Sequence, residues 1–205
     1  MPKWNTHLYV AEQINRTLKC TGRDREEFLL GNILPDINNG WLVKGVHKRI
    51  LHDETHICSE NEFAWSHFYD KYKKCIQEKK PLYLGYLLHL FTDARMNDDY
   101  YEAIKGTWVE KEERDRQRIL KQEDFGKLDD ALGRSGLMLE NIKSDVVALS
   151  GISEVDINED DLRLVNEYLS REDRMLEKEY NFYTEEELLS LVYGISEDYI
   201  ERFVK

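Results

Sequence analysis

Proline and glycine are scarce in this sequence, which has three prolines and eleven glycines in 205 residues. Long loop-rich or disordered tracts usually contain more of both, so we expect few such tracts. Cysteine is also rare: Cys20, Cys58 and Cys75 are odd in number and show no CxxC spacing. We interpret them as reduced thiols, which predicts a cytoplasmic protein.

The chain lacks a run of apolar residues long enough to cross a membrane as a helix. Its most apolar run, Leu82 to Phe91, is too short and contains His89. The first ten residues, MPKWNTHLYV, also lack the apolar core of a secretory signal. We therefore expect no integral membrane association.

Basic side chains are in the minority, since 29 Lys and Arg stand against 41 Asp and Glu, which gives a net charge of -12. Binding to a nucleic-acid backbone or to anionic lipid headgroups depends largely on Lys and Arg. We therefore expect no nucleic acid among the partners of this protein.

Helical periodicity is abundant, and no alternating strand pattern or internal repeat accompanies it. The predicted fold class is therefore all-α. We expect a single helical domain over 1–205, with the candidate metal ligands in a half at 1–106 and more charged outer helices in 107–205. The expected helices cover about 7–18, 25–34, 61–79, 82–96, 108–132, 137–150, 159–180 and 184–204.

Two of these segments carry sharper expectations. The helix at 25–34 should end at Pro35, because the residue before a proline avoids helical geometry. The helix at 82–96 is apolar on nearly every side, which is typical of a helix buried at the centre of a domain. We therefore predict that 82–96 is the buried central helix.

The same helix contains the strongest local signal for chemistry, His89 followed four residues later by Asp93. Residues at this spacing lie on one helix face, with about 5–6 Å between their β-carbons. An ionised Asp in so apolar a helix is costly unless something neutralises it. A metal ion would do so. A salt bridge to Arg95 or to a distant lysine would also do so, with His89 as a hydrogen-bonded core histidine.

The other candidate residues carry little weight one by one. His7 lies on the inward face of the first helix, where a single histidine is more often part of the core than a ligand. Asp36 follows Pro35, which is also ordinary turn chemistry. His52 and His56 are four residues apart and offer one or two ligands.

The order of these residues is more informative than any one of them. The chain contains Thr6-His7, then Gly-Asn-Ile-Leu-Pro-Asp36, then Thr55-His56, then Leu-Gly-Tyr-Leu-Leu-His89-Leu-Phe-Thr-Asp93. This succession resembles the zinc-dependent phospholipase C family, whose helical domain occurs in clostridial alpha-toxins and is similar to that of the S1/P1 nucleases. The resemblance covers about the first hundred residues.

The resemblance implies a set of zinc ligands. One zinc ion would be held by Asp36, His56, His89 and Asp93, and a second by His7 together with Asp93. The family's third ion uses two further histidines and a glutamate, and Asp99 stands where the first of those histidines is expected. We therefore expect one or two ions and no complete third site.

Two further departures from the family pattern concern the ends of the chain. In the secreted enzymes of this family, the amino group of a terminal Trp is also a ligand. The nearest Trp here is Trp4, which is internal, so the second ion would lack that ligand. The toxins carry a separate C-terminal membrane-binding domain, which the acidic, helical second half of this chain does not resemble.

The resemblance implies a metal-dependent hydrolase of phosphoester bonds. The metal ion would activate water and polarise a phosphoryl oxygen, with Asp36 as a ligand or as the catalytic general base. The expected substrate is a small-molecule phosphoester or a phospholipid headgroup. A soluble phosphodiester is favoured over lipid because the chain is acidic.

Two alternatives remain open at this stage. An HD-type phosphohydrolase, also helical, would use an upstream His, an adjacent His-Asp pair and a distant Asp, which could be His7, His52, Asp53 and Asp93. This assignment leaves His89 and Asp36 without a role. The other alternative is a non-catalytic helical binding protein in which Asp93 is neutralised by an ordinary salt bridge.

Overall fold

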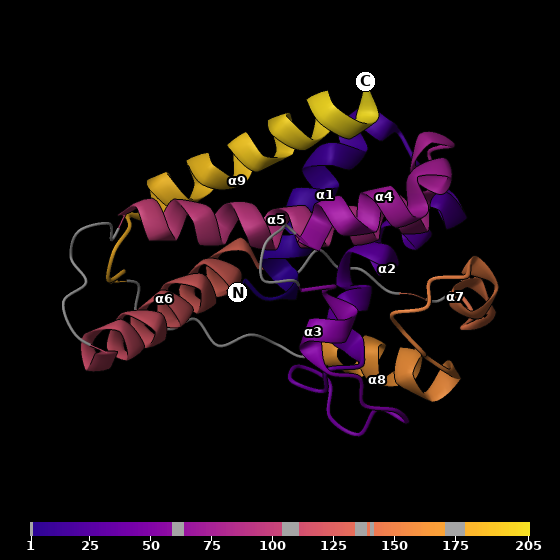
Figure 1. The fold of residues 1–205 in the computed structure, drawn as a ribbon, viewed down its shortest axis with the longest axis horizontal. Helices are drawn as coiled ribbons and strands as arrows, with labels where there is room; N and C mark the ends of the chain where they lie inside the picture. Colours follow the sequence, from indigo (N-terminus) through magenta and orange to yellow (C-terminus); the bar gives the residue numbers. More distant parts are fainter. Residues whose placement is uncertain (1, 59–63, 104–110, 134–138, 140–141, 171–178) are drawn as a thin grey trace.

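The computed structural model describes the whole chain except residues 1, 59–63, 104–110, 134–138, 140–141 and 171–178 (Figure 1). Its helices are α1 (Trp4–Leu18), α2 (Gly22–Ile37), α3 (His52–Thr55), α4 (Ala64–Gln77), α5 (Pro81–Ala103), α6 (Lys111–Leu132), α7 (Asp145–Ser150), α8 (Glu159–Leu169) and α9 (Glu185–Tyr199), which continues into a π-helical turn at Ile200–Val204. Strands are absent from the described residues, so the all-α prediction is confirmed. The expected change of character near residue 106 falls outside the described residues.

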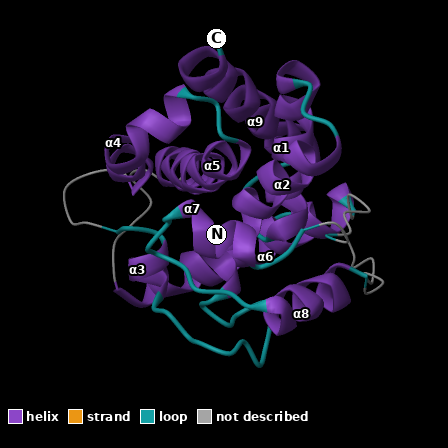
Figure 2. Ribbon diagram, turned by 90° about the vertical axis from the view of Figure 1, so that its right-hand side faces the viewer, coloured by secondary structure: helices purple, strands orange, loops and turns teal. Residues whose placement is uncertain are grey.

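Helix α5 is the centre of the fold. It lies between α4 on one side and α1, α2 and α9 on the other (Figure 2). The hydrophobic side chains from Leu82 to Phe91 are at most 5% exposed, which confirms the predicted buried central helix. Pro81 opens α5, at the position where the missing N–H of a proline is not needed. Within the described part of the chain, no helix is long and apolar enough to cross a membrane.

Helices α2 and α5 touch along their backbones at two glycines. A β-carbon on Gly31 would lie 2.2 Å from the Leu82 carbonyl oxygen, and one on Gly85 would lie 2.1 Å from the Phe28 carbonyl oxygen. Real β-carbons do not come so close to backbone oxygens, so any larger residue would push the helices apart. The two glycines therefore set the separation of the helices that carry Asp36, His89 and Asp93.

The prediction that the second helix ends at Pro35 is wrong, because α2 continues through Pro35 to Ile37. The proline lies in the last turn, so the helix forgoes only the hydrogen bond that residue 35 would donate to the Gly31 carbonyl. The continuation is functionally relevant. It places Asn32 and Asp36 four residues apart on one helical face rather than leaving Asp36 in a turn.

Two expected helices in the second half are too long. The segment before α7 is not helical at 142–144, and residues 179 and 180 after α8 are not helical either. Before α7, side chains of α8 accept hydrogen bonds from the backbone. The Leu139 N–H donates to Asn166 Oδ1 at 2.9 Å, and the Ser144 N–H donates to Glu159 Oε1 at 2.7 Å. The remaining parts of the expected helices at 61–63, 108–110 and 171–178 lie outside the described residues.

A buried carboxyl group joins α6 to the start of α1. Asp129 is 4% exposed and accepts hydrogen bonds from the Thr6 N–H at 2.8 Å and the Thr6 hydroxyl at 3.1 Å. These bonds satisfy a backbone donor in the first turn of α1, at the third residue of the helix. Burial nevertheless raises the pKa of Asp129 to about 6.

This raised pKa predicts a pH-dependent loss of stability. Between the ordinary pKa of an aspartate and 6, the folded protein keeps a proton that the unfolded chain has released, so stability falls as pH rises. From pH 4 to pH 7, the free energy of unfolding of the wild type should fall by about 2 kcal/mol relative to Asp129→Asn. Urea unfolding of both proteins in chelator measures this difference, and parallel pH profiles would contradict the prediction.

Candidate metal centre

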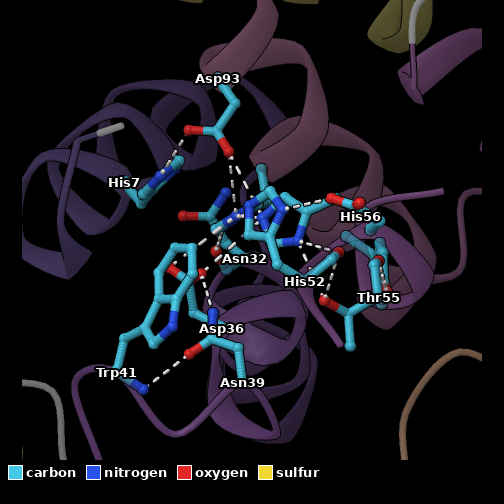
Figure 3. Close-up of polar contacts among 12 residues, drawn as sticks. His7, Asn32, Asp36, Asn39, Trp41, His52, Thr55, His56 and Asp93 are labelled. Atoms are coloured by element: carbon cyan, nitrogen blue, oxygen red, sulfur yellow. Dashed lines mark hydrogen bonds and ion pairs between the residues drawn. The ribbon is translucent and has the colours of Figure 1, made fainter. Parts of the chain in front are cut away.

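Five of the six predicted ligands lie together at the junction of four helices (Figure 3). All five side chains belong to buried residues, the most exposed of which is Asp93 at 6%. They are His7 from α1, Asp36 from α2, His56 directly after α3, and His89 and Asp93 from α5. We call these five residues the His-Asp cluster.

Four members of the His-Asp cluster surround a common point. The Nε2 atoms of His56 and His89 are 3.1 Å apart. One oxygen of Asp93, Oδ2, lies 3.4 Å from His56 Nε2 and 3.6 Å from His89 Nε2. Asp36 faces the same two nitrogens with its two oxygens, at 3.7 Å from His56 and 4.0 Å from His89.

These distances fit a tetrahedral zinc ion. Ligand atoms at about 2.0–2.2 Å from such an ion lie about 3.3–3.6 Å from one another. The five pairs above span 3.1–4.0 Å. His nitrogens and Asp oxygens are both atoms that zinc binds. The donor set and its spacing therefore suit a zinc ion.

The hydrogen bonds of the two histidines direct their lone pairs at this point. His89 Nδ1 lies 2.8 Å from the Asn32 carbonyl oxygen, and His56 Nδ1 lies 3.2 Å from the His52 carbonyl oxygen. A carbonyl only accepts, so each Nδ1 carries a proton, and in the neutral form of each ring Nε2 is the unprotonated nitrogen that can bind a metal ion. Two such nitrogens and the carboxylates would repel one another unless a proton or a metal ion lies between them.

The second oxygen of Asp93 points the other way. Asp93 Oδ1 is 3.4 Å from His7 Nε2, and the His7 ring stacks on the His89 ring with centroids 3.9 Å apart. Neither nitrogen of His7 and neither oxygen of Asp93 has a hydrogen-bond partner, although all four atoms are buried. Buried polar atoms are rarely left in this state. The Asp93 carboxylate thus faces histidine nitrogens on two sides, and His7 also offers a ligand atom within 4.8 Å of ligand atoms of Asp36 and His89.

The ionisation of the cluster follows from burial and mutual charge. Burial lowers the pKa of His89 well below its usual value, and the neighbouring His7 adds to this effect. Burial also raises the pKa of Asp36. For Asp93, the close approach of His56 and His7 outweighs burial and holds its pKa well below the usual range. The centre therefore combines a buried anion, Asp93, with a neutral imidazole, His89.

Asp99, the sixth predicted ligand, is not part of the His-Asp cluster. It is exposed on α5, six residues beyond Asp93, and lies beside the Tyr183 hydroxyl. Six residues advance a helix by about 9 Å and turn it to a different face, which explains the separation. Trp4 is fully buried against the Tyr168 ring, with its indole nitrogen unpaired.

The residue set of the HD-type alternative is not assembled. The Asp53 side chain is 84% exposed, with an oxygen 3.4 Å from His52 Nδ1, and no group of candidate ligands among the described residues joins it to His7 or Asp93. The ordinary salt bridge to Arg95 that was considered as the alternative for Asp93 is not formed either, because Arg95 pairs with Asp198 at 3.1 Å. His89 and Asp36 instead lie inside the cluster, as the ligand set implied by the resemblance to zinc-dependent phospholipase C requires.

Several supporting residues were missed in the sequence. Asn32 links three helices: when its amide is oriented to satisfy its neighbours, it donates to the His7 carbonyl at 2.7 Å and accepts from the His89 N–H at 3.2 Å. Asn39 donates to Asp36 Oδ1 at 2.8 Å. Asn32 stands four residues before Asp36, and this spacing was the only signal that could have indicated its role.

An aromatic column connects the cluster to the surface. The His52 ring stacks on His56 with centroids 3.7 Å apart, and Trp41 stacks on His52 at 5.0 Å. Trp41 is 58% exposed, so it is the outer end of this column (Figure 3). The rings of His52 and Trp41 thus extend outward from His56, the cluster member at the inner end of the column.

Comparison with known proteins gives one match. Residues 6–96 match the family model described as zinc dependent phospholipase C. Neither the curated proteins nor the solved structures contain a match to the chain. The matched segment begins one residue before His7 and contains all five members of the His-Asp cluster. The family prediction is therefore confirmed for the part of the chain that builds this site: residues 6–96 match the zinc-dependent phospholipase C family.

Proposed function

We propose that this protein is a zinc-dependent phosphoester hydrolase and that the His-Asp cluster holds its metal. The observation that carries the proposal is the convergence of buried lone pairs on one point, with His56 and His89 nitrogens 3.1 Å apart beside Asp93. A core built only for stability would gain by replacing such a group with apolar side chains. The family match over residues 6–96 supports a phosphoester as the substrate class.

The first ion would be held by Asp36, His56, His89 and Asp93. A second ion would use His7 and the outer oxygen of Asp93, which makes Asp93 the shared ligand. Asp99 is left out of this set because its carboxylate lies away from the cluster. Zinc in such a site lowers the pKa of water to about 7 and acts as a Lewis acid toward a phosphoryl oxygen.

The protein's own contribution is orientation and proton handling. The Asn32 carbonyl fixes the tautomer of His89, and the His52 carbonyl fixes that of His56, so both rings present Nε2 inward. Asn39 holds the Asp36 carboxylate at 2.8 Å. Asp36 has one oxygen toward each imidazole, so it is proposed as a ligand that also serves as the general base.

We propose a soluble phosphodiester as the substrate, with a phospholipid headgroup as the second candidate. The net charge of -12 supports this order, because anionic bilayers repel an acidic surface. The cytoplasm remains the proposed compartment. The three cysteines are all free thiols, which supports a reducing environment.

Hydrolysis assays test the proposal. The zinc-loaded protein should cleave bis(p-nitrophenyl) phosphate and p-nitrophenyl phosphorylcholine, and chelator should remove at least about 90% of the rate until zinc is restored. His89→Ala should be inactive, whereas Asp53→Asn, altered at an exposed position, should keep the wild-type rate. Stoichiometric zinc without turnover of any diester, monoester or short-chain phosphatidylcholine would instead support the non-catalytic binding protein.

A further inference from the structure

A buried lysine lies beside the metal centre and has no role in the function proposed above. Lys121 on α6 is 6% exposed, although lysine is almost never buried unless its charge is paired. Its Nζ donates to Asn97 Oδ1 at 2.9 Å and lies 4.9 Å from the centre of the Tyr100 ring. Among the described residues, no carboxylate forms a direct ion pair with its ammonium group.

The position of Asn97 links this lysine to the His-Asp cluster. His89, Asp93 and Asn97 follow one another at intervals of four residues, so they share one face of α5. Asn97 is therefore one helical turn, about 6 Å along the axis, beyond Asp93. Lys121 also interacts electrostatically with Asp93 itself. The polar face of α5 thus runs from the cluster to an ammonium group on α6.

The contacts of Lys121 leave most of its hydrogen-bonding capacity unused. An ammonium group has three donors, and the Asn97 oxygen accepts from one of them. The Tyr100, Tyr101 and Phe125 rings lie 4.9–5.9 Å from Nζ and can stabilise the charge, but they accept no strong hydrogen bond. A methionine would fill the same space without the desolvation penalty of a buried charge.

We propose that Lys121 binds the phosphate group of the substrate, with its ammonium donating to a non-bridging phosphate oxygen. This inference rests on the proposed function, because the phosphate must lie at the His-Asp cluster. One helical turn is about the distance over which a phosphate group at the cluster could still accept from an ammonium. Asn97 then holds the ammonium in place, and the aromatic rings keep water from it.

The test uses inorganic phosphate as the probe and the zinc-loaded protein. Lys121→Met should weaken phosphate binding at least about 10-fold in calorimetry and raise KM for a phosphodiester by a similar factor. Zinc content should stay at the wild-type value. Lys121→Arg should recover part of the affinity, because a guanidinium also donates to phosphate. If Lys121→Met does not fold, Lys121→Gln replaces it.

Arg118→Met is the matched control. It removes the same charge from the same helix three residues away, where the Arg118 side chain is 68% exposed. This variant should bind phosphate within about twofold of the wild type, since exposed charges are screened by solvent and salt. An equal loss in both variants would overturn the inference in favour of a general charge effect.

Other outcomes separate this inference from the proposed function. The role of Lys121 would be overturned if Lys121→Met and Lys121→Gln bound phosphate as tightly as the wild type. It would also be overturned if these variants lost their zinc. Neither result would contradict the proposed hydrolase. The absence of phosphate binding by the zinc-loaded wild type would overturn it as well. Phosphate binding that depends on Lys121, in a protein that cleaves no ester, would support the lysine site and reject the hydrolase.

Discussion

Asp93→Asn should bind zinc at least about 100-fold more weakly than the wild type, a difference of about 2.7 kcal/mol. Asp93 lies close to histidine nitrogens on two sides, with Oδ2 at 3.4 Å from His56 and Oδ1 at 3.4 Å from His7. The asparagine has the same shape but no charge, and its amide nitrogen cannot bind a metal ion. Loss of a hydrogen bond that only orients a metal ligand typically lowers metal affinity about 10–100-fold. Loss of the ligand itself should therefore lower zinc affinity by at least about 100-fold.

Elemental mass spectrometry and competition with a chromophoric chelator measure this loss. Thermal unfolding gives an independent measurement, because zinc that binds only the folded state raises the wild-type Tm with concentration. Asp93→Asn should show almost no such rise. Asp99→Asn on the same helix and Asp53→Asn after the stacked His52 should both behave as the wild type. Zinc loss in Asp53→Asn as well as in Asp93→Asn would restore the HD-type ligand set, which contains both residues.

The placement of His89 and Asp93 on a common face could be predicted, because the spacing of residues along a helix is a local property of the sequence. His89 and Asp93 are four residues apart, and this spacing alone places both side chains on one face of α5. The convergence of His7, Asp36 and His56 on that face depends on tertiary packing, which spacing does not determine. Their order along the chain was informative only through the family resemblance.

The end of a predicted helix was wrong where side chains distant in the sequence form hydrogen bonds with the backbone. Asp124 accepts the backbone N–H groups of Asn181 and Phe182, each within 2.8 Å, after the expected helix at 159–180 has already ended. No local pattern indicates such a contact across about 57 residues. Pro35 was mispredicted for a different reason, since a proline in a last turn removes only one hydrogen bond.

Lys121 shows the same limit at the functional level. It stands in a strongly charged segment, where the pattern indicates an exposed outer helix. Only the tertiary structure turns this one cation inward, toward Asn97 and the aromatic rings. Sequence patterns therefore located the residues on α5, but they could not identify the partners that other helices contribute.

Gly85→Ala should destabilise the protein by about 3 kcal/mol or more, at the upper end of the range for overpacked cores. The new methyl group would lie 2.1 Å from the Phe28 carbonyl oxygen and 2.8 Å from the Asn32 backbone nitrogen. Both atoms belong to the α2 backbone, so no side chain can move aside. The helices must separate, and for a chain of this size we expect Tm to fall by about 6 °C or more.

The same separation should also damage the metal centre, because Asp36 is on α2 and His89 and Asp93 are on α5. A shift of about 1 Å is enough to lower catalysis about 100-fold, so residual activity should be lost even where the variant is folded. Gly194→Ala is the matched control: this glycine lies inside α9 with open space around its α-carbon. Alanine there should stabilise the helix by about 0.5–1 kcal/mol. A Gly85→Ala variant as stable and as active as Gly194→Ala would mean that the α2–α5 contact does not set the geometry of the His-Asp cluster.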